Sequence, residues 1–234
     1  MPPLLRHALL LAAAATAAAH ADCPPQTPRA LLERFVAASC AACWKTPPPL
    51  AREHRQAWVL DWVVPPPPGT PPPGAPLQAF LLGAAQPEAA ARMARQGSLA
   101  GDETVAVSHP LPQRTALDVL VDSTRLPEGR IELHMAARFT SQRPLPAGLQ
   151  GWMVLVERLP AGDQKSPVDR QVVRAVAGPL AMEGLAQAPV AHRRVMDLPE
   201  QGDPQQLAVL AWVETSKGRV IAAGRGPLPD CPAH

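Results

Sequence analysis

The segment from Ala30 to Lys45 constrains the fold of this 234-residue chain more than any other stretch. An apolar run at Ala30–Ala38 predicts a buried strand, and Cys40 and Cys43 follow where residues 40–45 open a helix. This helix is expected to kink or restart at Pro47-Pro48-Pro49 and to continue over Leu50–Ala57. The N-terminus of a helix carries unpaired N–H groups and a partial positive charge, which lower the pKa of a nearby thiol. The Cys-x-x-Cys spacing at this junction therefore predicts a redox dithiol.

Residues 1–21 have the pattern of a secretory signal peptide. Ala8–Ala19 is apolar except for Thr16, and Ala19-His20-Ala21 supplies small residues at the two cleavage-reading positions. The run is shorter than the ~20 residues that a membrane-spanning helix needs. We expect cleavage before Asp22 and no stable membrane span afterwards; an uncleaved N-terminal anchor is the alternative.

The composition indicates a bacterial protein of the periplasm or the exterior. The chain contains no Asn and no Tyr, and Lys and Ile are scarce, which is typical of a GC-rich genome. Loss of Arg6 with the signal peptide leaves 21 of the 22 basic side chains against 20 acidic ones. Because no basic stripe stands out from this balance, nucleic acid is not an expected partner.

Four cysteines follow the predicted cleavage point, and three pairings of two disulfides are possible. We expect Cys40–Cys43 and, as a structural disulfide, Cys23–Cys231, since the second pair lies at the two chain ends and the termini of a domain are often close. Closing a loop of about 200 residues stabilises by roughly 5 kcal/mol, whereas a four-residue loop gains only about 2 kcal/mol. The Cys40–Cys43 disulfide would therefore stabilise the fold only weakly. Its position where a strand meets a helix favours a role in thiol–disulfide exchange.

The N-terminal half predicts a βαβ unit. Ala57–Val64 is a nearly continuous apolar run, typical of a central strand parallel to the first. The Pro-rich insertion 65–76 is expected to be a surface loop, because proline removes backbone donors. Pro87–Gln96 has the signature of a helix, and Thr104–Val107 that of another strand.

From about residue 115 the pattern changes to short apolar runs separated by Gly, Pro and Asp clusters, which predict an antiparallel β-sandwich with Trp152 and Trp212 in or over its core. The expected fold class is thus α+β, with an α/β domain followed by a β-sandwich-like domain. The expected boundaries are 1–21 for the signal peptide, 22–112 and 113–228 for the two domains, and 229–234 for a C-terminal tail.

Several segments resemble a secreted, thioredoxin-like bacterial family of unknown function, whose first strand reads V-E-L-F-T-S-Q-G-C-x-x-C. Leu32–Cys43 keeps the Glu, the Phe and both cysteines of that motif in register. Softer matches are Trp58–Trp62, Trp152–Glu157, Arg170–Arg174 ahead of Gly178-Pro179, and Leu207–Glu214. The resemblance implies a thioredoxin-like fold for the N-terminal domain.

The main functional hypothesis is thiol–disulfide exchange with the thiols or disulfides of exported proteins. Cys40, nearer the helix start, is the expected attacking thiolate, and Cys43 would resolve the mixed disulfide. Arg34 would lower the thiol pKa only if its side chain turned toward the sulfurs. Glu33 is either a proton shuttle or a plain surface acid, and the surface interpretation is favoured.

The alternative is a non-catalytic periplasmic binding or envelope-associated protein with structural disulfides. Ala41 and Ala42 between the cysteines favour it, as does the lack of a clear cis-proline loop, for which Pro110 and Pro112 are the nearest candidates. No cofactor is expected, since no nucleotide-binding fingerprint is present. No metal is expected either, because no metal-ligand spacing links the histidines, which include His54, His109, His134, His192 and His234.

Overall fold

The computed structural model describes residues 28–45, 56–66, 85–96, 104–112, 116–141, 144–163, 166–200 and 202–226. The predicted signal peptide, Cys23, the expected helix continuation over 46–55, Cys231, the tail 229–234 and all of the Pro-rich insertion except Pro65 and Pro66 lie outside the described residues.

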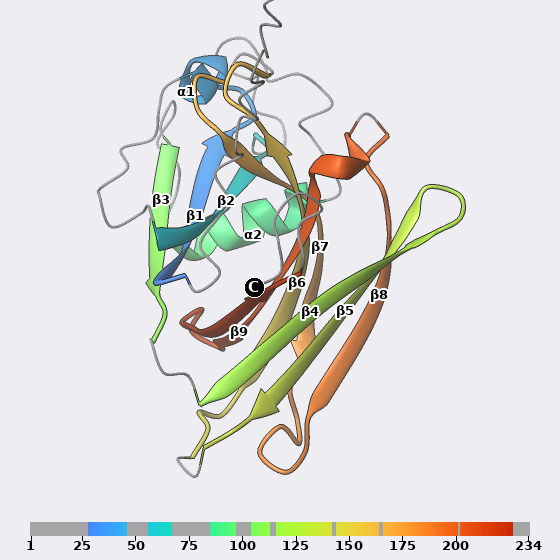
Figure 1. Cartoon of the computed structure of the whole chain (residues 1–234). Helices are drawn as coiled ribbons and strands as arrows, with labels where there is room; N and C mark the ends of the chain where they lie inside the picture. The colour runs from blue at the N-terminus through green and yellow to red at the C-terminus, as the bar shows by residue number, and fades with distance from the viewer. Residues whose placement is uncertain are drawn as a thin grey trace, which may run out of the picture.

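The described residues form strands at every position where the sequence predicts one, and helices after Cys40 and over residues 87–96. Figure 1 shows these elements along the chain. In order they are β1 Ala30–Ala37, α1 Ala41–Lys45, β2 Ala57–Val64, α2 Gln86–Gln96, β3 Thr104–Pro110, β4 Leu117–Leu126, β5 Arg130–Phe139, β6 Leu149–Leu159, β7 Arg170–Ala181, β8 Val190–Asp197, a 3₁₀ turn Pro204–Gln206, β9 Leu207–Thr215 and β10 Val220–Arg225.

The strands form two sheets. Seven of them form one sheet in the order β10-β9-β6-β7-β2-β1-β3, and the other three form a smaller sheet in the order β4-β5-β8. β1 runs parallel to β2, as the apolar run at Ala57–Val64 predicts, and antiparallel to β3. β2 runs parallel to β7, with Asp61 opposite Val172. Strands from the two halves of the chain are therefore hydrogen-bonded neighbours in one sheet.

The predicted fold class, a thioredoxin-like α/β domain followed by a separate β-sandwich, is wrong. The structure is mostly β, and within the described residues α-helix is confined to α1, with five residues, and α2, with eleven. β2 is buried along nearly its whole length and pairs on both edges, with β1 on one side and β7 on the other. Four C-terminal strands, β6, β7, β9 and β10, therefore extend the N-terminal sheet, and of the described strands only β4, β5 and β8 form a separate one.

The two faces of the large sheet bury different cores. One face packs on α2 and holds the aromatic side chains of both halves, among them Phe35, Trp62, Trp152 and Trp212. The opposite face of β6, β9 and β10 packs against the inner side of the three-stranded sheet, which crosses it in Figure 1. Trp152 and Trp212 are thus buried, but they face α2 and not the interior between the two sheets.

Gly224 lets the two sheets approach closely at β10 and β4. A Cβ built on this glycine would lie 2.1 Å from the carbonyl oxygen of Val119, a backbone atom that cannot turn aside. A Cβ on Gly226, two residues further on, would meet its nearest neighbour at 3.7 Å, an ordinary contact.

Gly224→Ala is expected to lower the free energy of unfolding by about 2 to 3 kcal/mol, the usual cost of forcing an extra carbon into a packed contact. Gly226→Ala, the matched control, should change it by less than about 1 kcal/mol. Urea denaturation followed by circular dichroism measures both. Equal effects of the two substitutions would contradict the close approach of β10 and β4.

Candidate functional site

Cys40 and Cys43 form a disulfide where β1 gives way to α1, at the upper end of β1 in Figure 1. Their Cα atoms are 5.3 Å apart, and the backbone N–H of Cys43 donates to the Sγ of Cys40 at 3.1 Å. This confirms the predicted Cys40–Cys43 pairing, whereas the predicted Cys23–Cys231 pair lies outside the described residues. The catalytic role assigned to Cys40 and Cys43 stays a prediction.

The disulfide is part of the packed interior. Cys40 is only 5 % exposed and Cys43 only 8 %. They belong to an apolar cluster on the end of the sheet, whose other members include Val36, Val63 and Val172 from three adjacent strands. A molecule approaching from solvent therefore meets very little of either cysteine.

Asp61 in β2 lies beneath α1 and is completely buried. Its carboxylate accepts from Arg34 of β1 at 2.5 Å, from Arg170 of β7 at 3.4 Å and from the backbone N–H of Gln171 at 2.7 Å. Three strands thus converge on one carboxylate, and the two cations compensate its charge.

Arg170 connects this carboxylate to α1. Its Nη2 donates to the carbonyl oxygen of Trp44 at 2.6 Å, and its Cζ lies 4.7 Å from the centre of the Trp44 ring. Burial lowers the pKa of Arg170 more than the charge of Asp61 raises it. The guanidinium thus satisfies a carbonyl at the end of the helix that holds the cysteines. Arg34, proposed from the sequence as a thiol activator, is paired with Asp61.

The sequence-based interpretation of Glu33 as a surface acid is wrong. Glu33 is 1 % exposed and points to the α2 side of the sheet, opposite to Arg34. Its oxygens accept from Arg92 Nε at 2.7 Å and from Trp62 Nε1 at 3.0 Å, and the Nε2 of His109 lies 2.8 Å away. Burial by itself raises the pKa of Glu33, but the contacts with His109 and Arg92 outweigh it and hold the pKa below its ordinary 4.5.

Arg92 of α2 is the centre of this second network. Besides Glu33, its Nη2 donates to Glu214 of β9 at 3.0 Å, and the nearby carboxylates raise its pKa. Its Cζ lies 5.0 to 5.7 Å from the ring centres of Trp62, Trp152 and Trp212. Sequence reasoning missed Arg92, although a signal exists: it lies between Ala89 and Met93 on the buried face of α2.

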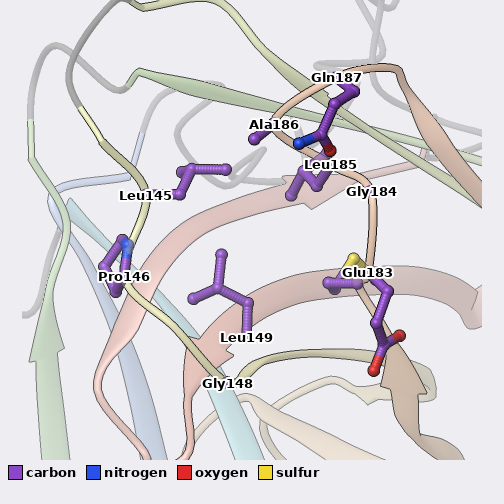
Figure 2. Close-up of a pocket in the computed structure, with 10 residues that line it drawn as sticks. Leu145, Pro146, Gly148, Leu149, Glu183, Gly184, Leu185, Ala186 and Gln187 are labelled. Atoms are coloured by element: carbon purple, nitrogen blue, oxygen red, sulfur yellow. The ribbon is translucent and has the colours of Figure 1, made fainter.

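The described residues include a pocket of about 290 Å³ away from both networks (Figure 2). It lies between the segment 145–149 and the turn 182–187. Leu145, Leu149 and Leu185 point toward one another, while the carboxyl end of Glu183 points away from them. The lining exposes about as much polar as apolar surface, and it supplies no nucleophile or paired acid and base.

Nowhere in the described ranges do three His, Cys, Asp or Glu side chains gather closely enough to hold a metal ion. Pro110 and Pro112, the sequence candidates for a cis-proline, are in trans; among the described residues the one cis peptide bond is Gly178-Pro179 in β7. None of the helices in the described part of the chain has the length and apolar character needed to cross a membrane.

No family model and no curated protein sequence matches this chain. Its structure is similar to that of HBP35 of Porphyromonas gingivalis, with a TM-score of 0.53 and 12 % identity over 86 % of this chain and 76 % of that one. A domain of the outer membrane lipoprotein Omp28 from the same organism aligns with a TM-score of 0.33 and 12 % identity, over 47 % of this chain and 86 % of that one. Likeness at this identity concerns the fold alone, and the resemblance of Leu32–Cys43 to a secreted family stays a prediction.

Arg170→Leu is expected to lower the free energy of unfolding by about 3 to 5 kcal/mol, because it leaves the buried Asp61 with one cation fewer and removes the hydrogen bond from Arg170 to the Trp44 carbonyl. The control is Arg158→Leu, which removes a partly exposed pair with Asp169 and should cost less than about 1 kcal/mol. Urea denaturation measures the difference. Equal losses would show that Arg170 does not hold α1.

Glu33→Gln is expected to make the free energy of unfolding depend less on pH under acidic conditions. Because the pKa of Glu33 is lowered on folding, its ionised form stabilises the protein fully above about pH 5, and that stability is lost as the pH falls below the ordinary 4.5 toward the folded pKa. The free energy of unfolding between pH 6 and 3 (approximate limits of the acid range) should therefore fall less in Glu33→Gln than in the wild type. Exposed Glu128, substituted in the same way, should leave the slope unchanged.

Proposed function

We propose that this chain is an extracytoplasmic, non-catalytic binding or envelope-associated protein in which the Cys40–Cys43 disulfide is structural. The burial of both cysteines supports this most directly. Reactive cysteines are partly exposed and lie in electropositive surroundings, whereas buried ones are usually inert.

The contacts around the disulfide support a structural role. Exchange requires a partner's sulfur to reach Cys40 Sγ along the S–S axis, and Cys40 and Cys43 expose only 5 % and 8 % of their surface. Arg170 of β7 contacts the carbonyl and the ring of Trp44 in α1 and holds the segment in place. The disulfide then fixes the turn by which β1 enters α1, which agrees with the small loop that it closes.

The proposed compartment rests on two observations. The N-terminal 21 residues have the charge, apolar run and cleavage pattern of an exported protein. A disulfide between Cys40 and Cys43 is stable in an oxidising compartment and is rare as a structural element in the cytosol.

The binding part of the proposal rests on the pocket between residues 145–149 and 182–187. Its leucine side chains suit a small apolar group, and its volume of about 290 Å³ is near the lower end for small-molecule sites. The single carboxylate nearby, Glu183, has no acid or base beside it in the lining. This lining favours binding over chemistry.

Thiol–disulfide exchange through Cys40 and Cys43 is the second candidate. The observation in its favour is the N–H of Cys43, which points at Cys40 Sγ at 3.1 Å and would stabilise a thiolate there. In that reaction a partner's thiolate attacks Cys40 Sγ, breaks the Cys40–Cys43 bond and releases the Cys43 thiolate. A second thiolate of the partner then attacks the partner's own sulfur in the mixed disulfide and releases the Cys40 thiolate, so that the partner is oxidised by two electrons and the Cys40–Cys43 disulfide is reduced.

A trapping experiment separates the two candidates. Cys43→Ser leaves Cys40 without its resolving partner, so an exchange protein would accumulate mixed disulfides on Cys40 during expression in a bacterial periplasm. We expect no such species on non-reducing gels, and Cys40→Ser serves as the matched control. We also expect the Cys40→Ser/Cys43→Ser double variant to fold, with about 2 kcal/mol less stability.

Mixed disulfides that depend on Cys40 and are absent from the Cys40→Ser control would overturn the structural role and favour exchange. A double variant as stable as the wild type would contradict the structural role in another way, because the disulfide would then contribute nothing to the fold.

A further inference from the structure

Three indoles and two carboxylates on the α2 side of the large sheet surround one cation. We call this group, Trp62, Trp152, Trp212, Glu33 and Glu214, the tryptophan chamber. Its members come from β1, β2, β6 and β9, and none comes from α2. Trp152 and Trp212 are direct partners in the β6–β9 ladder, and their rings stack at 6.3 Å and 16°. The walls of the chamber are therefore set by strand pairing and not by the helix that covers them.

The occupant is a single side chain. The guanidinium of Arg92 lies 5.7, 5.1 and 5.0 Å from the ring centres of Trp62, Trp152 and Trp212. It donates through Nε and Nη2 to both oxygens of Glu33, at 2.7 and 3.2 Å, and through Nη2 to Glu214. A planar cation between aromatic faces, with a carboxylate bound by two N–H groups, is the arrangement that recognises guanidinium most selectively.

The rest of α2 contributes little to its own docking. Its buried apolar residues are Ala85, at the helix start, Ala89 and Met93. Burying a methyl group stabilises by only about 0.8 kcal/mol, so two alanines and one methionine are a small apolar anchor. The contacts of Arg92 therefore account for much of what holds α2 against the sheet.

Arg92 does not use every polar group of the chamber. Among the described residues neither Trp152 Nε1 nor Arg92 Nη1 has a hydrogen-bond partner, although both atoms are buried and Trp152 is 3 % exposed. A carboxylate oxygen of Glu88 lies 3.8 Å from Arg92 Nη1. A buried N–H without an acceptor costs about 1 to 3 kcal/mol. The chamber thus offers a donor that a ligand with both a guanidinium and an acceptor, such as an arginine residue of a peptide, would satisfy.

We propose that the tryptophan chamber is a binding site for guanidinium groups, and that Arg92 is its tethered occupant, which an arginine side chain from another molecule replaces. The two carboxylates select a cation, the three indoles select a flat and weakly hydrated one, and the sheet keeps the site formed when α2 moves away. This deepens the proposed binding role by naming a ligand class, and it is independent of the state of the Cys40–Cys43 disulfide.

The test removes the tethered cation and supplies a free one. In full-length Arg92→Ala, methylguanidinium is expected to change the tryptophan fluorescence saturably, with a Kd of about 1 to 10 mM. It should also raise the unfolding temperature with concentration, because it binds only the folded state. Urea, which is flat but uncharged, should bind at least about tenfold more weakly.

One control variant changes another arginine of α2, and a second changes a carboxylate of the tryptophan chamber. Arg95→Ala removes an exposed arginine of α2 that pairs with Glu88. Arg95→Ala and the wild type should both show no saturable fluorescence response to methylguanidinium below about 10 mM. In both proteins Arg92 is still present and competes for the site at a millimolar or higher effective concentration. Arg92→Ala/Glu214→Gln should bind methylguanidinium about tenfold more weakly than Arg92→Ala.

A folded Arg92→Ala that shows no saturable response to methylguanidinium, or the same response to urea, would overturn the proposal. If Arg92→Ala does not fold alone, it is refolded with methylguanidinium. Recovery of the native circular dichroism spectrum supports the site, and failure to recover at any concentration up to about 50 mM counts against it. Neither outcome bears on mixed-disulfide trapping, so failure here leaves the structural role of the disulfide to be judged separately.

Discussion

The carboxylate of Asp61 joins the two halves of the chain. It lies in β2 with no exposure to solvent, and it receives Arg34 from β1 and both Arg170 and the Gln171 N–H from β7. A carboxylate buried this deeply is tolerated only when charges and hydrogen bonds surround it. The pairing of β2 with β7 and the position of α1 over the sheet both follow from how that requirement is met.

Much of the local structure could be predicted from the sequence, because short apolar runs and helix-start residues act locally. Ala57–Val64 reads as a buried strand, and Pro87 with Glu88 marks the start of α2. Strand pairing could not be predicted, since an apolar pattern shows which faces are buried and not which strands are neighbours. The expectation of a separate thioredoxin-like domain was wrong for this reason. The apolar pattern of β2 correctly indicates a central strand, but its second neighbour is β7, from the other half of the chain.

The candidate site was predicted only in part for a related reason. The Cys40–Cys43 disulfide follows from a spacing of three residues, whereas its support by Arg170 depends on residues 126 positions apart. Adjacent Glu33 and Arg34 illustrate the same limit, since strand geometry sends them to opposite faces and into separate networks. Reactivity and binding therefore depend on long-range contacts that a local motif does not contain.

We expect the strands of both halves to unfold as one cooperative sheet. Native-state hydrogen exchange in increasing urea measures this, because amides that open together share one free energy and one denaturant dependence. The amides of β1 and β2 are predicted to merge with those of β6 and β7 into a single unfolding transition. Two transitions, with β1 and β2 exchanging independently of β6 and β7, would contradict the account.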